Sequence, residues 1–175
     1  MAENDLLYLE LQDNEWAFTF TDHDRPIARA IVIDDEGFLY FVRAHRDDDF
    51  GEATLIETSG GGVEKGEKPE DAIIRELREE LGAETEIIRQ IGVVSDYYNL
   101  IHRHNINHYF LCRVKSFGEK NLTPDEISEF HLSTLKLTFD EAEKDYQTRA
   151  ETRIGRLIRN RELPILRRAR EILNK

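Results

Sequence analysis

Cysteine, proline and long apolar runs are all scarce in this chain of 175 residues. The single cysteine, Cys112, cannot form an internal disulfide, and its apolar neighbours favour a small buried side chain over a nucleophile. No apolar run approaches the roughly 20 residues that span a bilayer. The first ten residues also lack the basic start and apolar stretch of a signal peptide. We therefore expect a cytoplasmic protein that does not contact membranes.

Positive charge is in deficit as well, because 24 Lys and Arg stand against 36 Asp and Glu, for a net charge of -12. Nine of the basic residues and only three acids lie between Arg149 and Lys175, so this segment carries +6 and the rest of the chain -18. An acidic body repels nucleic-acid polymers. It can still bind phosphates through divalent cations held between its carboxylates and theirs. The charge therefore favours a small phosphorylated ligand.

Length and patterning predict one layered α/β or α+β domain, in which residues 1–148 form the body. Residues 149–175 are expected to form a basic helical segment that packs on this body or on a second copy in a homodimer. Pro164 should kink that segment or divide it into two helices. Residues 45–51 are expected to form a charged loop, and residues 59–62 are expected to end the strand predicted at 54–57. Strands are predicted over 16–21, 27–34, 38–44, 54–57, 86–96 and 105–114, and a short helix over 138–147.

One further helix is predicted from Pro69 to a left-handed cap at Gly82, because an apolar stripe recurs at helical spacing. Its acids Glu76, Glu79 and Glu80 stand at i, i+3 and i+4, so they share one face and repel one another. A divalent cation would reverse that repulsion, and ligands that are all oxygen favour Mg²⁺ or Mn²⁺ over zinc. Arg75 lies four residues before Glu79 and can hold its carboxylate.

An acid-rich helix alone usually indicates only a solvated face. The joint spacing argues otherwise, since it fixes eight positions within 23 residues. The stretch resembles the Nudix box, the signature of hydrolases that cleave a nucleoside diphosphate linked to another group. Only Ala83 departs from that pattern, where a larger aliphatic residue is usual. The matching positions are Gly61, five residues, Glu67, seven residues, Arg75-Glu76-Leu77, one residue, Glu79-Glu80, one residue and Gly82.

The resemblance implies an α/β/α sandwich with a mixed sheet and a loop-helix-loop box. It also implies a metal site formed by Glu76, Glu79 and Glu80, with the carbonyl of Gly60 as a further ligand. Arg75 would orient the glutamates, and Glu67 would support the loop. Gly61 and Gly62 would let the backbone approach the substrate closely.

The resemblance also implies that a box glutamate such as Glu76 or Glu79, or an acid on a later loop, takes the proton from the attacking water, and in some members of the family the later acid is decisive. The candidates are Asp125, Glu126 and Glu129, with Glu126 preferred as a catalytic acid or base. A solvated turn is an equally acceptable interpretation of this segment.

Aromatic, histidine and arginine side chains outside the box have two interpretations each. Tyr97 and Tyr98 could stack on a nucleobase, or one of them could alternate into the core. Alternation would place three histidines on one strand face, as a second metal site or as a polar or substrate-contacting edge. The arginines of the C-terminal segment could pack on the acidic body or reach substrate phosphates. The three histidines are His102, His104 and His108.

The resemblance leaves several functions open. The leading hypothesis is a Mg²⁺- or Mn²⁺-dependent hydrolase of a nucleotide pyrophosphate bond, acting on a nucleoside triphosphate or a dinucleoside polyphosphate. The alternative is a Nudix module that binds a nucleotide without cleaving it, although such modules commonly lose box glutamates that this chain retains. A Nudix isomerase would need a catalytic cysteine, which the apolar run around Cys112 does not favour.

Overall fold

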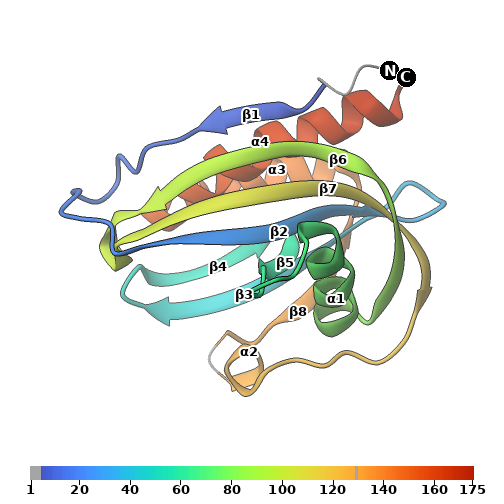
Figure 1. Ribbon diagram of the computed structural model, residues 1–175, viewed down its shortest axis with the longest axis horizontal. Coiled ribbons are helices and arrows are strands. Elements are labelled where there is room, and N and C mark those ends of the chain that lie inside the picture. The colour runs from blue at the N-terminus through green and yellow to red at the C-terminus, as the bar shows by residue number, and fades with distance from the viewer. Residues whose placement is uncertain (1–4, 129) are drawn as a thin grey trace.

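The computed structural model describes residues 5–128 and 130–175, whose strands form one mixed sheet (Figure 1). The order along the sheet is β1-β6-β7-β2-β3-β4, while β5 pairs with β2 and β8 with β3. The mixed sheet with helices confirms the predicted α/β class. The strands are β1 (Leu7–Glu10), β2 (His23–Ile33), β3 (Leu39–Asp48), β4 (Gly51–Glu57), β5 (Ser59–Gly62), β6 (Ala83–Tyr98), β7 (Arg103–Phe117) and β8 (Ser133–Leu137).

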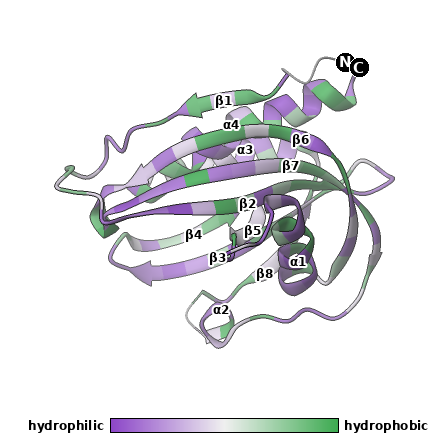
Figure 2. Ribbon diagram, in the orientation of Figure 1, coloured by the Kyte–Doolittle hydropathy of each residue, from purple (hydrophilic) through white to green (hydrophobic). Residues whose placement is uncertain are grey.

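Strands β2 and β7 run parallel at the centre of the sheet, with His23 opposite Arg103 and Ile33 opposite Arg113. Both strands are hydrophobic in their middle parts, whereas the starts of β2 and β7 and the end of β3 are hydrophilic (Figure 2). Parallel pairing therefore brings polar residues about 80 positions apart in the chain to the same end of the sheet.

Helices cover both faces of the sheet (Figure 1). Helix α1 (Pro69–Leu81) packs on one face through a cluster that includes Ala72, Ile73 and Leu77. Helices α3 (Phe139–Arg149) and α4 (Arg153–Leu173) pack on the other face in a larger cluster. The three-residue 3-10 helix η1 (Asn99–Ile101) joins β6 to β7, and α2 (Pro124–Ser128) is a single short turn beside the sheet.

Helix α1 begins and ends where the sequence predicts. Pro69 occupies its first turn, and Gly82 ends it with φ 64°, donating its N–H to the carbonyls of Arg78 and Leu77. A side chain at Gly82 would also meet the carbonyl oxygen of Gly118 at 2.3 Å. Glycine is thus required at this cap by both backbone conformation and space.

Helix α4 is one continuous helix, so the expected division at Pro164 is wrong. The residues on both sides of Pro164 are buried, and this packing holds the helix together across the missing hydrogen bond. Several arginines of the segment form ion pairs with acids elsewhere in the chain: Arg156 with Glu15, Arg161 with Glu57 and Asp96, Arg167 with Glu143, Arg168 with Asp5, and Arg170 with Asp140.

Three other segments differ from the sequence prediction. Residues 16–21 form no strand, because Asp13 accepts the N–H groups of Glu15 and Trp16 and bends the chain, while Asn99 donates to the Trp16 carbonyl. The expected loop at 45–51 is mostly strand, since β3 continues to Asp48 and β4 begins at Gly51. Ser59 to Gly62 is not a break but strand β5. The short edge strand β1 was not predicted.

Candidate active site

Arg75 is the centre of the hydrogen bonding in the box. Its guanidinium donates two bonds to Glu67, at 3.0 and 2.9 Å, one to Glu76 at 2.8 Å, and one at 3.1 Å to the Gly62 carbonyl. A longer contact of 3.4 Å reaches Glu79. The bonds from Arg75 lower the pKa of Glu67 to about 2. Arg75 therefore ties the loop before α1 to the acidic face of the helix.

Glu80 is 8% exposed and faces strand β5 rather than solvent. Its Oε2 atom accepts hydrogen bonds from the Ser59 hydroxyl at 2.6 Å and the Gly60 N–H at 3.1 Å. Burial raises the pKa of Glu80 to about 8, and the charges of Glu76 and Glu126 act in the same direction. Glu80 therefore does not project into solvent from the polar side of the helix. Helix α1 instead turns this carboxyl toward the sheet.

Glu76 and Glu126 lie near enough to Glu80 to repel it. Burial raises the pKa of Glu76, although the bond from Arg75 opposes this effect. The Glu76 carboxylate rests against the backbone of Gly61, where a β-carbon would come within 2.5 Å of Oε1. Glu126 reaches the same region from α2, and its Oε1 accepts the Thr123 N–H at 2.8 Å. The charges of Glu76 and Glu126, from two different elements, thus both act on Glu80 near the glycines.

Glu79 does not face the same space as Glu80. It lies beside Arg75 and lines a separate hollow with Gly82 and Asn121. Within residues 5–128 and 130–175, no three acidic, histidine or cysteine side chains are grouped closely enough to hold a metal ion. The expected convergence of Glu76, Glu79 and Glu80 is therefore not present. Nevertheless, the oxygen-only donors and mutual repulsion of Glu76, Glu80 and Glu126 suit a hard divalent cation.

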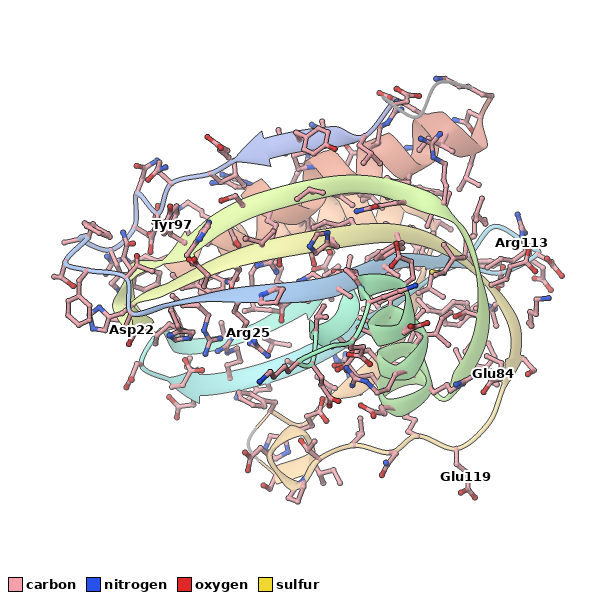
Figure 3. The ribbon with its side chains drawn as sticks, viewed as in Figure 1. Asp22, Arg25, Glu84, Tyr97, Arg113 and Glu119 are labelled. Carbon is pink, nitrogen blue, oxygen red and sulfur yellow. The ribbon has the colours of Figure 1, made fainter. Side chains whose placement is uncertain are left out.

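A cavity of about 280 Å³ lies between the box and the hydrophilic end of the sheet. Glu80, Glu126, Gly60 and Gly61 form its acidic wall. The remaining lining includes basic and aromatic residues, together with the acid Glu57 and several aliphatic side chains. Figure 3 shows one of the arginines, Arg25, beside β2 on the side of β3 and β4. The basic and aromatic residues are Arg25, Arg29, Arg46, Arg103, Phe50, Tyr98 and Phe130, with Asn105 on the floor.

The sequence predictions did not find this basic part of the cavity. Arg25, Arg103 and Asn105 stand in no motif, and only the parallel register of β2 and β7 brings them together. The one signal in the sequence is arginine and asparagine at alternate positions of strands, where core residues are usual.

The two predicted tyrosines have different surroundings. Tyr98 lines the cavity, its hydroxyl accepts a bond from Arg161 at 2.6 Å, and burial raises its pKa to about 12. Tyr97, the next residue along β6 (Figure 3), points to the other face of the strand. Its ring stacks on His104 with ring centroids 4.5 Å apart. Tyr97 is not among the residues that line the cavity.

The predicted histidines and late acids are spread apart. His104 bonds Asp24 and Ser95, while His102 precedes β7 and stacks on Phe20. Together with His108 they form no metal cluster in the described part of the chain. Asp125 is exposed, and Glu129 lies outside the described residues.

The family model of the NUDIX domain matches residues 23–154. Two curated relatives are each 31% identical to the chain. One is the RNA pyrophosphohydrolase of Hydrogenovibrio crunogenus, matched over 123 residues, 62% of this chain and 71% of that protein. The other is the ADP-ribose pyrophosphatase of Bacillus subtilis, matched over 119 residues, 68% of this chain and 61% of that protein.

Solved structures share the fold. The NUDIX hydrolase from Nitrosomonas europaea gives a TM-score of 0.59 at 17% identity, covering 71% of this chain and 79% of that one. The MutT NUDIX hydrolase from Burkholderia pseudomallei gives 0.56 at 22% identity, covering 69% and 87%. The chain therefore belongs to the Nudix hydrolase family. It is a hydrolase of phosphoanhydride bonds, as the resemblance of its box implied.

Within residues 5–128 and 130–175, none of the helices has the length and apolar character needed to span a bilayer.

Proposed function

We propose that this enzyme hydrolyses a pyrophosphate bond in a small nucleotide with the help of Mg²⁺ or Mn²⁺. The observation that best supports this proposal is the acidic wall, where Glu80 and Glu126 border the same cavity as the backbone of Gly60 and Gly61. Such a wall would repel a phosphate chain unless divalent cations stood between them. The two curated relatives, an RNA pyrophosphohydrolase and an ADP-ribose pyrophosphatase, are named for this kind of chemistry.

The residues that would hold the metal are Glu76, Glu80 and the carbonyl of Gly60. Glu79 would join them only after turning away from Arg75 and from the separate hollow that it lines. When bound, the metal would neutralise charge on the phosphates and lower the pKa of a water molecule. Arg75 would keep Glu76 in place, and Glu67 would keep Arg75 in place, through the bonds at 2.8 to 3.0 Å. Because Ser59 and Gly60 both bond Oε2 of Glu80, the Oε1 atom stays available to the cavity.

Glu126 would take the proton from the attacking water. It enters the cavity from α2, outside the box, and Thr123 fixes only one of its two carboxylate oxygens. Tyr98 keeps its proton at neutral pH, because burial raises its pKa, and would offer its ring to the substrate as an apolar wall. Tyr97 would contact the base only where a substrate extends beyond the cavity.

The test is a hydrolysis screen with Mg²⁺ or Mn²⁺ over nucleoside triphosphates, dinucleoside polyphosphates, nucleotide sugars and ADP-ribose. We expect Glu80→Gln to lower turnover of the best substrate by about 10²-fold or more, because it removes a ligand charge where transition-state charge develops. The metal-free variant should be at least as stable as the wild type, since a buried carboxyl becomes a neutral amide of the same shape.

Leu77→Ala is the matched control on the same helix. Leu77 is fully buried, so its truncation should cost roughly 2–5 kcal/mol of unfolding free energy while the folded molecules retain turnover. Wild-type turnover in Glu80→Gln would refute the catalytic role of this helix. Silence of the wild type over the whole panel would favour a module that binds nucleotides without cleaving them.

A further inference from the structure

The cavity is lined by three arginines that form no ion pair among the described residues, although the charges of Glu57 and Glu162 act on Arg29 and that of Glu76 acts on Arg25. Arg46 pairs with Asp48 at 2.8 Å. In contrast, Arg25, Arg29 and Arg103 form no ion pair with any carboxylate of residues 5–128 and 130–175. Burial and the charges of Arg103 and Arg29 lower the pKa of Arg25, which places the three guanidinium groups close enough to repel. In a protein of net charge -12, such a group is an exception.

Asn105 lies beneath these arginines and also lacks partners. It stands directly opposite Arg25 in the register of β2 and β7, two positions after Arg103 on the same face. The residue is 1% exposed, and neither Oδ1 nor Nδ2 has a hydrogen-bond partner among the described residues. The Nε atom of Arg103 is likewise buried and unpaired. A buried amide without partners is destabilising, because it has lost its hydrogen bonds to water and gained none.

Asn107, two positions further along β7, has an ordinary structural role. Its amide donates to the Val94 carbonyl and to Asp96, and accepts from Arg29. The same residue type on the same strand face is thus fully bonded at 107 and unbonded at 105, where the cavity begins. This contrast identifies Asn105 as a residue directed toward a ligand.

The two ends of the cavity are suited to different ligands. The acidic wall at Glu80 and Glu126 suits phosphates that carry divalent cations. The end at Arg25, Arg29, Arg103 and Asn105 suits an anion directly, since guanidinium groups bind phosphate oxygens in pairs and an amide N–H adds a donor. A diphosphate joined to a neutral sugar would satisfy only the first end.

We propose that Arg25, Arg29, Arg103 and Asn105 bind a further phosphate of the substrate, so that the enzyme selects chains of three or more phosphates over a diphosphate joined to a sugar. This proposal rests on the proposed function for the metal end of the cavity. The ligand chemistry that fits this site is a 5′-triphosphate, which either a free nucleotide or the 5′ end of an RNA can supply.

The test combines a binding and a kinetic measurement. Calorimetry with inorganic tripolyphosphate in EDTA measures the arginine end without metal or turnover. Kinetics with Mg²⁺ then compare a nucleoside triphosphate, a short 5′-triphosphate RNA and ADP-ribose. Which of the two triphosphates is preferred identifies the source of the chain.

The variants are Arg103→Gln and Asn105→Asp, with Arg113→Gln as the control. Arg113 lies at the far end of the same strand, remote from Arg25 (Figure 3), and pairs with Asp35. Asn105→Asp introduces a carboxylate that pairs with the arginines, so it should raise the melting temperature while excluding phosphate. A gain of stability with a loss of binding cannot arise from misfolding.

We expect both variants to weaken tripolyphosphate binding about tenfold or more, and to lower the ratio of kcat/KM for triphosphate over ADP-ribose by a similar factor. Arg113→Gln should leave both quantities at the wild-type value. Unchanged tripolyphosphate binding, or an equal loss on all substrates, would overturn the anion site even if hydrolysis proceeds. Binding that depends on Arg103, in a protein that cleaves nothing, would instead contradict the proposed function and leave the anion site standing.

Discussion

At the scale of single residues, burial and hydrogen-bond partners give two glutamates of the box opposite pKa shifts. Glu67 and Glu80 belong to the same box, yet the pKa of one falls to about 2 and that of the other rises to about 8. Glu67 lies near the surface and receives two bonds from Arg75, whereas Glu80 is buried against β5 with no cation among its bonded neighbours. The spacing of the box predicts a carboxylate at both positions. It does not predict that their pKa values shift in opposite directions.

Cys112 provides a pH prediction at this scale. The side chain is fully buried, and burial raises the pKa of its thiol to about 12. The folded state therefore holds a proton that the unfolded state loses above about pH 9, so the free energy of unfolding should fall between about pH 9 and pH 12. The part of this fall due to Cys112 should vanish in Cys112→Ala.

Alkylation measures the same burial independently. At pH 8, iodoacetamide should label the native protein far more slowly than the protein in denaturant. Equal rates in the two states would mean that Cys112 is accessible. It would also remove the packing argument against a nucleophilic role.

At the scale of elements, the local parts of the fold follow from the sequence and the non-local parts do not. Helix α1 is predictable because Pro69, Gly82 and its apolar stripe act within one helix, and the contacts of Arg75 span only eight residues or fewer apart from Gly62. The mistaken strand at 16–21 has a non-local cause. The Asn99 amide donates hydrogen bonds to the carbonyl oxygens of Asp13 and Trp16, more than 80 positions away, and no local pattern reveals these bonds.

The same division applies to the site. The box residues were predictable from spacing, whereas the arginine end depends on the register of β2 against β7. The alternation that would place Asn105 on a buried face is readable from sequence. What lies opposite it is not, because parallel strands are joined by long connections whose pairing no short segment encodes.

The contact between β5 and α1 yields a prediction about Gly61. Gly61→Ala would place a methyl group within 2.5 to 2.8 Å of the Glu76 carboxylate, the flexible end of a side chain. We expect Glu76 to move aside, so unfolding free energy should change by less than about 1 kcal/mol while turnover falls at least about tenfold. Denaturant unfolding and steady-state hydrolysis on one preparation measure both quantities.

Gly37→Ala is a suitable comparison, because Gly37 has open space around it but a φ of 90°. That variant should lose stability from backbone strain and keep its turnover once folded. If Gly61→Ala behaved in the same way, the position of Glu76 against Gly61 would be irrelevant to catalysis.

At the scale of the whole molecule, charge is arranged so that an acidic protein presents an anion-binding cavity. The basic residues of α4 are largely neutralised by acids of the body, and Arg161, although fully buried, contacts Glu57, Asp96 and Glu162. These pairs support the packing of α4 on the body over a direct role for its arginines in holding phosphates. The three cavity arginines that form no ion pair within residues 5–128 and 130–175, Arg25, Arg29 and Arg103, come instead from β2 and β7.

Metal binding should be visible in the stability of the whole protein. Mg²⁺ at about 100 times its dissociation constant should add about 2.7 kcal/mol, or roughly 5–10 °C in melting temperature. Glu76→Gln/Glu80→Gln should abolish most of that shift. Glu36→Gln/Glu119→Gln, which removes the same charge from exposed positions, should retain it. An equal shift in all three proteins would place the metal away from the box.

Helix α4 supplies about a third of the larger core cluster, and Glu162 from this helix bonds both the N–H and the hydroxyl of Thr58 at 2.7 and 2.8 Å. Thr58 leads directly into the glycines that border the cavity. A ribosome makes α4 after every strand that it covers, so a nascent chain exposes the apolar face of its sheet until these residues emerge. Catalytic competence is thus acquired only after α4 has been made, and a chain cut short before α4 should be a target for chaperones and proteases rather than a weak enzyme.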